Sequence, residues 1–186
     1  LQQVVYWDYV TLSSPKIYGP PGAAALIIKD SAMYDSYFRK RHLPTPNWLS
    51  IAGFGKACDL ISESLSDISR QHDLQKLFMN CLEKGIPDLE YNSAINGSVF
   101  NILNVYLPGI EGEALVMRCS VRGVHFSTGS ACAAKDIKPS HVLMSMFENA
   151  ERAHGSIRLS YGLYTTEDDV KYACDIIIDE YNKLKK

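Results

Sequence analysis

The chain has 186 residues, of which 46% are hydrophobic and 22% are charged, values that are ordinary for a globular protein. This length is enough to bury a substantial core, in one large domain or in one domain with an appendage. A net charge of −2 gives no reason to expect nucleic acid or an anionic membrane as a partner. No apolar run approaches the roughly 18 residues of a membrane span, so we expect no membrane segment.

The cysteine pattern bears on compartment and metal binding. The 5 cysteines are scattered and form no C-x-x-C pair; they are Cys58, Cys81, Cys119, Cys132 and Cys174. This odd set predicts neither a disulfide framework nor a structural zinc site, and we expect no metal. A reducing compartment follows, either the cytoplasm or an organellar matrix. The chain starts without methionine or a signal peptide, so we expect it to be part of a longer protein.

The first half of the chain is expected to form two strands and then helices. Residues 4–12 are rich in β-branched and aromatic side chains and predict a strand. Residues 23–28 are apolar throughout, which predicts a second strand that is buried on both faces. A turn-rich segment that contains Lys16 separates the two strands. The helical periodicity of residues 48–83 predicts helices with a break near His72.

Beyond residue 85 the alternating strand and helix patterns predict a compact α+β unit. Its strands are expected at residues 102–107, 124–126 and 156–160, and its helices at residues 111–122 and 139–147. Thr166 and the carboxylates that follow it form a capping-box pattern. This pattern predicts the start of a final helix, which runs to the C-terminal lysines.

Three residues carry side chains suited to an amino-acid substrate. Lys16 follows a strand, where lysines can bond covalently to carbonyl groups, although a lysine that reaches out to solvent is the commoner case. Cys132 follows small residues in a loop and is either an exposed nucleophile or an inert turn residue. Arg158 lies mid-strand between apolar neighbours and needs an anion, which is either a substrate carboxylate or an internal acidic residue.

These residues lie in motifs that resemble those of the pyridoxal-phosphate-dependent cysteine desulfurases, the NifS/IscS-like branch of the class V aminotransferase superfamily. Residues 127–132, S-T-G-S-A-C, resemble the active-site cysteine motif of that family. Residues 13–26 resemble its cofactor-lysine segment, S-x-H-K-x-x-G-P-x-G-x-G-A-L. Further motifs follow in family order at residues 101–105, 111–113, 139–143, 156–158 and 165–169. The resemblance covers nearly the whole chain, and the common order of its motifs makes it specific.

The resemblance implies an α/β architecture, the C-terminal part of a pyridoxal-phosphate-dependent transferase of fold type I. Residues 1–47 would be the end of the large cofactor-binding domain, with its part of the large-domain sheet. Residues 48–84 would be connecting helices, and residues 85–186 the small α+β domain with the cysteine loop. The family's upstream half, which surrounds the cofactor ring, is expected outside this chain. Family members are homodimers, so we expect a homodimer.

The resemblance also implies a role for each site residue. Lys16 matches the lysine that holds pyridoxal 5'-phosphate. Ser13 matches a phosphate-binding serine, and Thr45 a threonine that reaches the cofactor phosphate of the partner subunit. Cys132 matches the nucleophile that takes sulfur from L-cysteine as a persulfide and releases L-alanine, and Arg158 matches the arginine that holds the substrate carboxylate. The persulfide would pass to an acceptor or scaffold protein for iron–sulfur cluster assembly or tRNA thiolation.

The chain departs from the family pattern at several positions. Pro15 replaces the family's histidine before the lysine, and a proline donates no hydrogen bond. The glycine-rich G-G-G-Q-E stretch is missing, and residues 42–45 read H-L-P-T in place of R-S-G-T. These changes leave open a divergent, catalytically inactive paralogue that acts as a binding or sulfur-relay module. Another class V enzyme, such as a selenocysteine lyase or an aminotransferase, is a third option, although aminotransferases need no nucleophilic cysteine.

Overall fold

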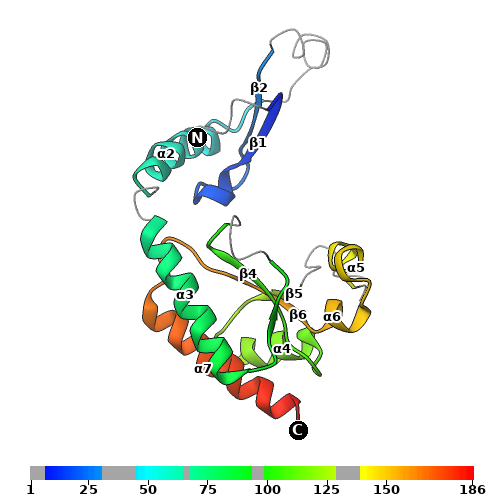
Figure 1. The fold of residues 1–186 in the computed structure, drawn as a ribbon. Coiled ribbons are helices and arrows are strands. Elements are labelled where there is room, and N and C mark those ends of the chain that lie inside the picture. The colour runs from blue at the N-terminus through cyan, green and yellow to red at the C-terminus, as the bar shows by residue number, and fades with distance from the viewer. Residues whose placement is uncertain (1–6, 31–44, 65–67, 94–98, 129–138) are drawn as a thin grey trace. The chain divides into compact units, whose positions relative to one another are not determined.

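A computed structural model describes residues 7–30, 45–64, 68–93, 99–128 and 139–186 of the chain. The chain forms two compact units, Leu1–Asp67 (unit 1) and Ile68–Lys186 (unit 2), and each has its own packing (Figure 1). Within the described residues, no helix has both the length and the apolar composition that crossing a membrane requires.

Unit 1 contains a hairpin, a short 3₁₀ helix and a long α-helix. Strands β1 (Tyr9–Ser13) and β2 (Ala24–Ile28) pair in antiparallel orientation. The 3₁₀ helix η2 (Ser14–Ile17) begins directly after β1, and helix α2 (Trp48–Ser64) packs against η2. Both strands predicted for this half of the chain are therefore confirmed within the described residues.

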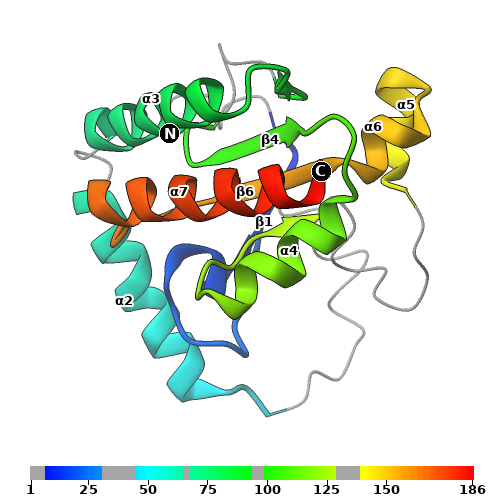
Figure 2. The ribbon, with the colours of Figure 1, turned by 90° about the horizontal axis from the view of Figure 1, so that it is seen from below.

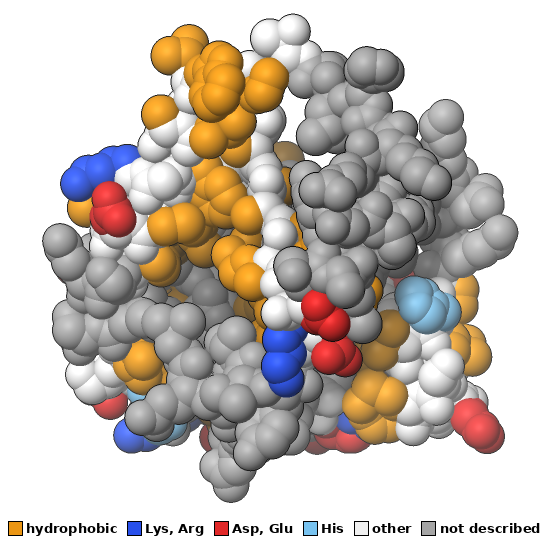
Figure 3. Space-filling view, turned by 90° about the horizontal axis from the view of Figure 1, so that it is seen from above, with side chains coloured by type: hydrophobic (Ala, Val, Ile, Leu, Met, Phe, Trp, Pro, Cys, Tyr) orange, Lys and Arg blue, Asp and Glu red, His pale blue; other side chains and the backbone are white. Residues whose placement is uncertain are grey.

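Strand β2 is more exposed than its composition predicts. An apolar strand is expected to be buried on both faces, yet Leu26 is 41% and Ile27 is 49% exposed. The expectation is wrong for unit 1, because its described sheet has only two strands and α2 packs mainly on η2. Hydrophobic side chains gather on the face of the molecule shown in Figure 3. Trp48 and Leu49, at the start of α2, are also exposed.

The segment after the hairpin forms two helices, as predicted, but the break between them lies elsewhere. Helix α2 ends at Ser64, and α3 (Ile68–Gly85) begins before His72, so the break predicted near His72 is wrong. Residues 65–67, between the two helices, lie outside the described part of the chain. Positions 66–67 read S-D, residue types that favour the start of a helix, and the apolar periodicity does not contain this signal.

Unit 2 is built on a four-stranded antiparallel sheet with the strand order β3-β4-β6-β5. The strands are β3 (Glu90–Tyr91), β4 (Ile102–Tyr106), β5 (Ser127–Thr128) and β6 (Ser156–Ser160). The predictions of β4 and β6 are confirmed, whereas the strand predicted at residues 124–126 is wrong. The amide of Val124 donates to the carbonyl of Cys119 at the end of the preceding helix, at 3.1 Å, and strand pairing starts only at Ser127.

Three helices cover one face of this sheet and supply most of the core (Figure 2). Helix α7 (Glu167–Leu184) packs against both α3 and α4 (Gly112–Val121). Alternate residues of β4 and β6 are buried against these helices, namely Leu103, Val105, Ile157 and Leu159. The predicted capping box is present, because the Thr166 hydroxyl accepts from the Asp169 amide and the Asp169 carboxylate accepts from the Thr166 amide.

Two short helices connect the end of the cysteine segment with β6. Helix α5 (His141–Phe147) confirms a predicted helix and is capped by Ser140, whose hydroxyl accepts from the amide of Leu143. Helix α6 (Ala150–His154) is not predicted, because five residues are too few to show a periodicity. Its first turn is capped by Asn149.

A buried carboxylate ties α4 to α7. The side chain of Glu180 is 5% exposed and accepts hydrogen bonds from Lys183 at 2.8 Å, Arg122 at 2.9 Å and Arg118 at 2.6 Å. The hydrogen bond from Lys183 is the largest of the effects that lower the pKa of Glu180 to about 2, and the two arginines add to it. The carboxylate therefore stays ionised in the folded protein at mildly acidic pH.

We expect unit 2 to lose stability as the pH falls from about 4.5, the ordinary pKa of a glutamate, toward about 2. A carboxylate whose pKa is lowered by folding stabilises the protein above its unfolded pKa, and protonation through the folded pKa removes this contribution. Glu180→Gln should lower the unfolding temperature at neutral pH by several degrees and flatten the acid branch of its pH profile, as measured by circular dichroism. Asp175→Asn, at an exposed position of α7, should change neither. An unchanged acid branch in Glu180→Gln would assign the sensitivity to other carboxylates.

Candidate functional site

Lys16 lies in the tight turn between β1 and β2. Helix η2 has Pro15 in its first turn and is followed by Tyr18, whose φ of 65° is left-handed. The amide of Gly19 donates to the carbonyl of Ser14 at 2.9 Å, which closes the turn. The Lys16 side chain is exposed and forms no ion pair with any described residue. An unpaired amine on a fixed turn is available for covalent bonding to a carbonyl group.

The hydroxyl-bearing residues of unit 1 differ in their surroundings. Ser13 is exposed and makes no capping bond to η2, so its hydroxyl is available to a ligand. Ser14 is fully buried, and a Cβ added at Gly19 would lie 2.3 Å from its Oγ, so position 19 has room only for glycine. Thr45 is exposed shortly before α2. Lys16 and Ser13 therefore place an exposed amine and an exposed hydroxyl close together in the chain, groups of the kind that an aldehyde cofactor with a phosphate group would use.

Arg158 lies on the sheet face opposite the helices. In β6 it alternates with Ile157 and Leu159, which are buried in the core, so its side chain projects from the other face. Its cross-strand neighbours are Asn104 of β4 and Ser127 of β5. None of the Asp and Glu residues that the structure describes pairs with Arg158. The alternative of an internal acidic partner therefore finds no support in this part of the chain.

The sequence-predicted residues fall into three places. Ser13 and Lys16 are brought together around η2, and Thr45 belongs to the same unit. Arg158 belongs to unit 2. Cys132 lies outside the described residues, as does most of the loop that carries it.

The simplest prediction from the sequence for the other four cysteines is that they are core residues, and the structure shows that they differ from one another in burial. Cys119 and Cys174 are buried, as predicted, and Cys81 is partly buried. Cys58 is exposed, so the prediction is wrong there, because α2 packs through its neighbouring Ala57 instead. Burial raises the pKa of Cys119 to about 11 and raises that of Cys174 further.

We expect iodoacetamide to label Cys58 in the folded protein and to spare Cys119 and Cys174. The thiolate is the reactive form, and a buried thiol with a raised pKa contains little of it. Mass spectrometry of peptides after a brief exposure at neutral pH measures the labelling, and the denatured protein, in which all cysteines should react, is the control. Native labelling of Cys174 would contradict the packing of α7 on α3.

Unit 2 also contains a hollow of about 220 Å³ between α7 and the segment that leads into β5. Its apolar walls include Phe78, Val124, Phe126, Leu159, Val170 and Ile177. Arg158 does not line it, because Leu159 projects to the core face of β6 and Arg158 to the opposite face. The hollow is therefore separate from the face where an anion would meet the arginine.

The sequence has relatives among known proteins. The family model described as Aminotransferase class-V matches residues 3–173. This chain belongs to the class-V aminotransferase family. The cysteine desulfurase IscS of Dictyoglomus turgidum is 35% identical over 185 residues, which cover 96% of this chain and 47% of the relative. IscS of Neisseria meningitidis is 33% identical over 191 residues, with 96% and 46% covered.

Solved structures related to this class-V chain share its fold. A NifS-like protein superposes with a TM-score of 0.80 at 24% identity, over 98% of this chain and 48% of that protein. A NifS-like protein from Rickettsia africae superposes with a TM-score of 0.73 at 25% identity, over 94% and 48%. The predicted relationship to the NifS/IscS-like branch of the class V aminotransferases and the predicted fold type I architecture are confirmed. The chain spans about half the length of the curated relatives it matches.

The structure of this class-V chain also adds polar residues that the sequence interpretation missed. Asn92, Asn104 and Arg152 form hydrogen bonds on or beside the sheet face that carries Arg158. The sequence contains one signal for Asn104, because antiparallel pairing of the strands predicted near residues 102 and 156 can place it beside Arg158. The contact of Arg152 with Asn92 spans 60 positions and had no sequence signal.

Proposed function

We propose that this chain is the C-terminal part of a cysteine desulfurase, which removes sulfur from L-cysteine and leaves L-alanine and a persulfide on Cys132. The observation that carries the proposal is the 35% identity to an IscS desulfurase over almost the whole chain. Arg158 supports it, because a substrate carboxylate would supply the anion that no described residue provides.

Each site residue has a defined task in this proposal. Lys16 holds pyridoxal 5'-phosphate, Ser13 binds the phosphate of that cofactor, and Thr45 binds the cofactor phosphate of the partner subunit. Arg158 holds the carboxylate of L-cysteine. When bound, the cofactor supplies an electron sink for bond breaking at the substrate. The Cys132 thiolate attacks the substrate sulfur, so that an S–S bond forms, the C–S bond breaks and a proton takes the place of the sulfur on carbon.

The proposal extends to the organisation of the whole protein. Residues 1–47 complete a large cofactor-binding domain, residues 48–84 connect it, and residues 85–186 form the small domain. The exposed apolar side chains of unit 1 support this division, because an N-terminal half of the protein would cover them. A homodimer in the cytoplasm, which passes the persulfide to an acceptor or scaffold protein for iron–sulfur cluster assembly or tRNA thiolation, completes the proposal.

Pro15 favours a second candidate, a divergent paralogue without catalysis that binds or relays sulfur. It occupies the family's histidine position in the first turn of η2, directly before Lys16, and it has no hydrogen-bond donor. In this candidate Lys16 remains an exposed amine, and Cys132 carries sulfur received from another protein.

Alanine release from L-cysteine, measured on the protein complete with its N-terminal half, separates the two candidates. The desulfurase should show visible absorbance of the lysine-bound cofactor, which Lys16→Ala removes and Lys56→Ala, at an exposed position of α2, retains. It should also release alanine, and Cys132→Ala should abolish this release. A protein with neither cofactor absorbance nor alanine release would overturn the desulfurase and leave the relay module.

A further inference from the structure

Three strands of unit 2 bring polar side chains into one row. Asn104 of β4 and Ser127 of β5 lie directly opposite Arg158 of β6, one on each side. Residues that face each other in antiparallel strands project from the same side of the sheet, with Cβ atoms about 4.5–5.5 Å apart. All three residues are half-buried, so their side chains remain within reach of a ligand.

The orientation of the Asn92 side-chain amide is fixed by its neighbours. Arg152 Nε, which can only donate, lies 2.7 Å from one atom of this amide, so that atom is the oxygen. Asn92 Nδ2 therefore donates, to Asn104 Oδ1 at 2.7 Å and to Ser156 Oγ at 2.8 Å. Ser156 can accept this bond because its own proton goes to the carbonyl of Arg152, at 2.6 Å.

This chain of bonds also decides which end of Asn104 remains available. Its carbonyl oxygen is occupied by Asn92, so its NH₂ group points away from Asn92. No described residue accepts a hydrogen bond from that NH₂ group, and none pairs with Arg158. An amide NH₂ group and a guanidinium side by side offer only donors. Two oxygens of one carboxylate are the acceptors that match them.

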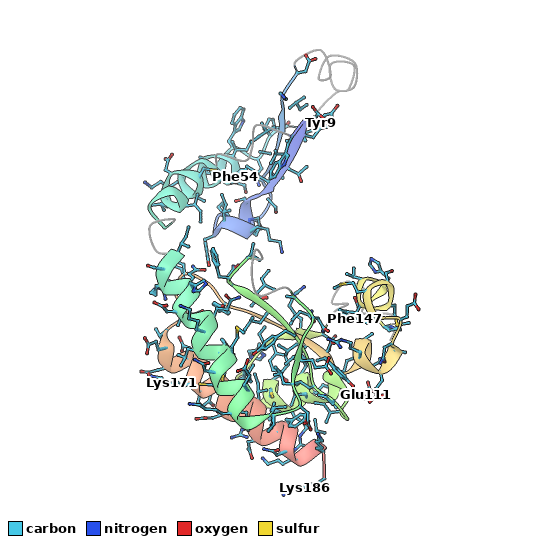
Figure 4. The ribbon with its side chains drawn as sticks, viewed as in Figure 1. Tyr9, Phe54, Glu111, Phe147, Lys171 and Lys186 are labelled. Atoms are coloured by element: carbon cyan, nitrogen blue, oxygen red, sulfur yellow. The ribbon has the colours of Figure 1, made fainter. Side chains whose placement is uncertain are left out.

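Arg152 is held firmly enough to impose this geometry. Its guanidinium lies over the ring of Phe147, 3.9 Å from the ring centroid, and forms an ion pair with Glu90. Phe147 is labelled in Figure 4. Asn92, which receives the hydrogen bond, is only 7% exposed. The oxygen and the NH₂ group of its side-chain amide are both paired, and a buried polar group whose hydrogen bonds are satisfied is held rigidly. Arg152 therefore acts on Asn104 through Asn92.

We propose that Asn104 is a second ligand of the substrate carboxylate, beside Arg158, and that Asn92 and Arg152 are positioning residues that keep its NH₂ group turned toward the substrate. This inference rests on the proposed function and adds to it the residue that would help to select α-amino acids. An amine without a carboxylate would leave both sets of donors unpaired, and unpaired buried donors are costly.

The first test measures binding without the cofactor. The side-chain amide signals of Asn104, identified by their loss in Asn104→Asp, are followed by ¹⁵N NMR on residues 1–186 during titration with L-alanine. We expect them to shift with L-alanine and not with ethylamine, which lacks the carboxylate. Asn92→Asp keeps the bond to Arg152 but replaces the donor to Asn104 with an acceptor, so the Asn104 amide should turn over. Binding of L-alanine should weaken at least about tenfold.

The second test measures kinetics on the full-length protein. Asn104→Asp and Asn92→Asp should each raise the KM for L-cysteine at least about tenfold and change kcat less, because the carboxylate is bound before and during the reaction. Asn182→Asp, at an exposed position of α7, makes the same charge change and should change neither. Asn104→Ala removes the donor without adding charge and should raise the KM in the same direction, which covers the case that an aspartate fails to fold there.

The outcomes separate the inference from the function on which it rests. Normal alanine release with an unchanged KM in the Asn104 variants overturns the inference and leaves the desulfurase in place. Absent alanine release together with Asn104 signals that shift with L-alanine overturns the desulfurase and supports the carboxylate site. Signals that respond to L-alanine and ethylamine alike, or to neither, overturn the site.

Discussion

Replacing Arg158 by methionine is expected to raise the KM for L-cysteine about 100-fold or more, with a smaller effect on kcat. A bidentate guanidinium makes two charge-assisted hydrogen bonds to a carboxylate, each worth about 1.5–3 kcal/mol, and every 1.4 kcal/mol corresponds to about tenfold in affinity. The carboxylate does not change during sulfur removal. Its binding energy is therefore equal in the ground state and the transition state, so the loss of this energy should raise KM and leave kcat nearly unchanged.

Steady-state sulfide release by the full-length protein, in the presence of a reducing thiol, measures this effect. Cysteamine is the second substrate, because it lacks the carboxylate and would leave ethylamine in place of alanine. Wild-type protein should prefer L-cysteine strongly, and Arg158→Met should lose most of this preference. Arg158→Lys keeps the positive charge but loses the two-pronged guanidinium geometry, so its preference for L-cysteine should lie between those of the wild type and Arg158→Met. Lys84→Met, at an exposed position of α3, removes one positive charge away from the sheet and is the control. A variant that kept the preference would place the carboxylate elsewhere.

The sequence predicts that Arg158 needs an anion but leaves two anions open. An arginine in the middle of an apolar strand places a positive charge on the sheet. It needs an anionic partner there, because burying an unpaired charge would be costly. The choice between a substrate and an internal acid depends on which residues flank it in neighbouring strands. That register places Asn104 and Ser127 there, neither of which is acidic. The sequence alone does not give this register, because the register depends on how the strands pair in the fold.

Helix α2 shows a different limit of sequence interpretation. Apolar periodicity assigns Cys58 to the buried face, but among the side chains of α2 that the structure describes, the buried ones are Ser50, Phe54 and Ala57. The reason is close approach, because a Cβ added at Gly53 would lie 2.6 Å from the ring of Pro20. Small residues therefore define the packed face, and hydrophobicity scales do not register smallness. Phe54, labelled in Figure 4, is the large side chain of that face.

The hydrogen-bond chain from Arg152 to Asn104 could not be predicted for a third reason. Its members are far apart in sequence, and each is an ordinary polar residue by itself. Helix α6, which carries Arg152, is too short for a periodic signal, and β3, which precedes Asn92, has only two residues. Elements of this size are specified by tertiary packing, so their positions follow from the fold and not from local propensity.

Replacing Gly112 by alanine is expected to destabilise unit 2 by about 2 kcal/mol. Its added Cβ would lie 2.9 Å from the carbonyl oxygens of both His154 and Ser156 and 3.3 Å from a methyl group of Ile157. The oxygens belong to backbone that cannot easily move, because the carbonyl of Gly155 between them accepts from the amide of Leu107 at 3.0 Å. The gain in helix propensity, up to about 1 kcal/mol, offsets only part of this cost.

Urea unfolding measures the loss, and Glu113→Ala, at the exposed next position of α4, should change stability by less than about 0.5 kcal/mol. Gly112→Ala should also disturb the hydrogen bonds that orient Asn104. The backbone that must yield includes Ser156, whose hydroxyl accepts from Asn92 and so helps to orient Asn104. We therefore expect Gly112→Ala to raise the KM for L-cysteine under conditions where the protein is fully folded. Lost stability with an unchanged KM would show that the α6–β6 connection relaxes without disturbing the hydrogen-bond chain.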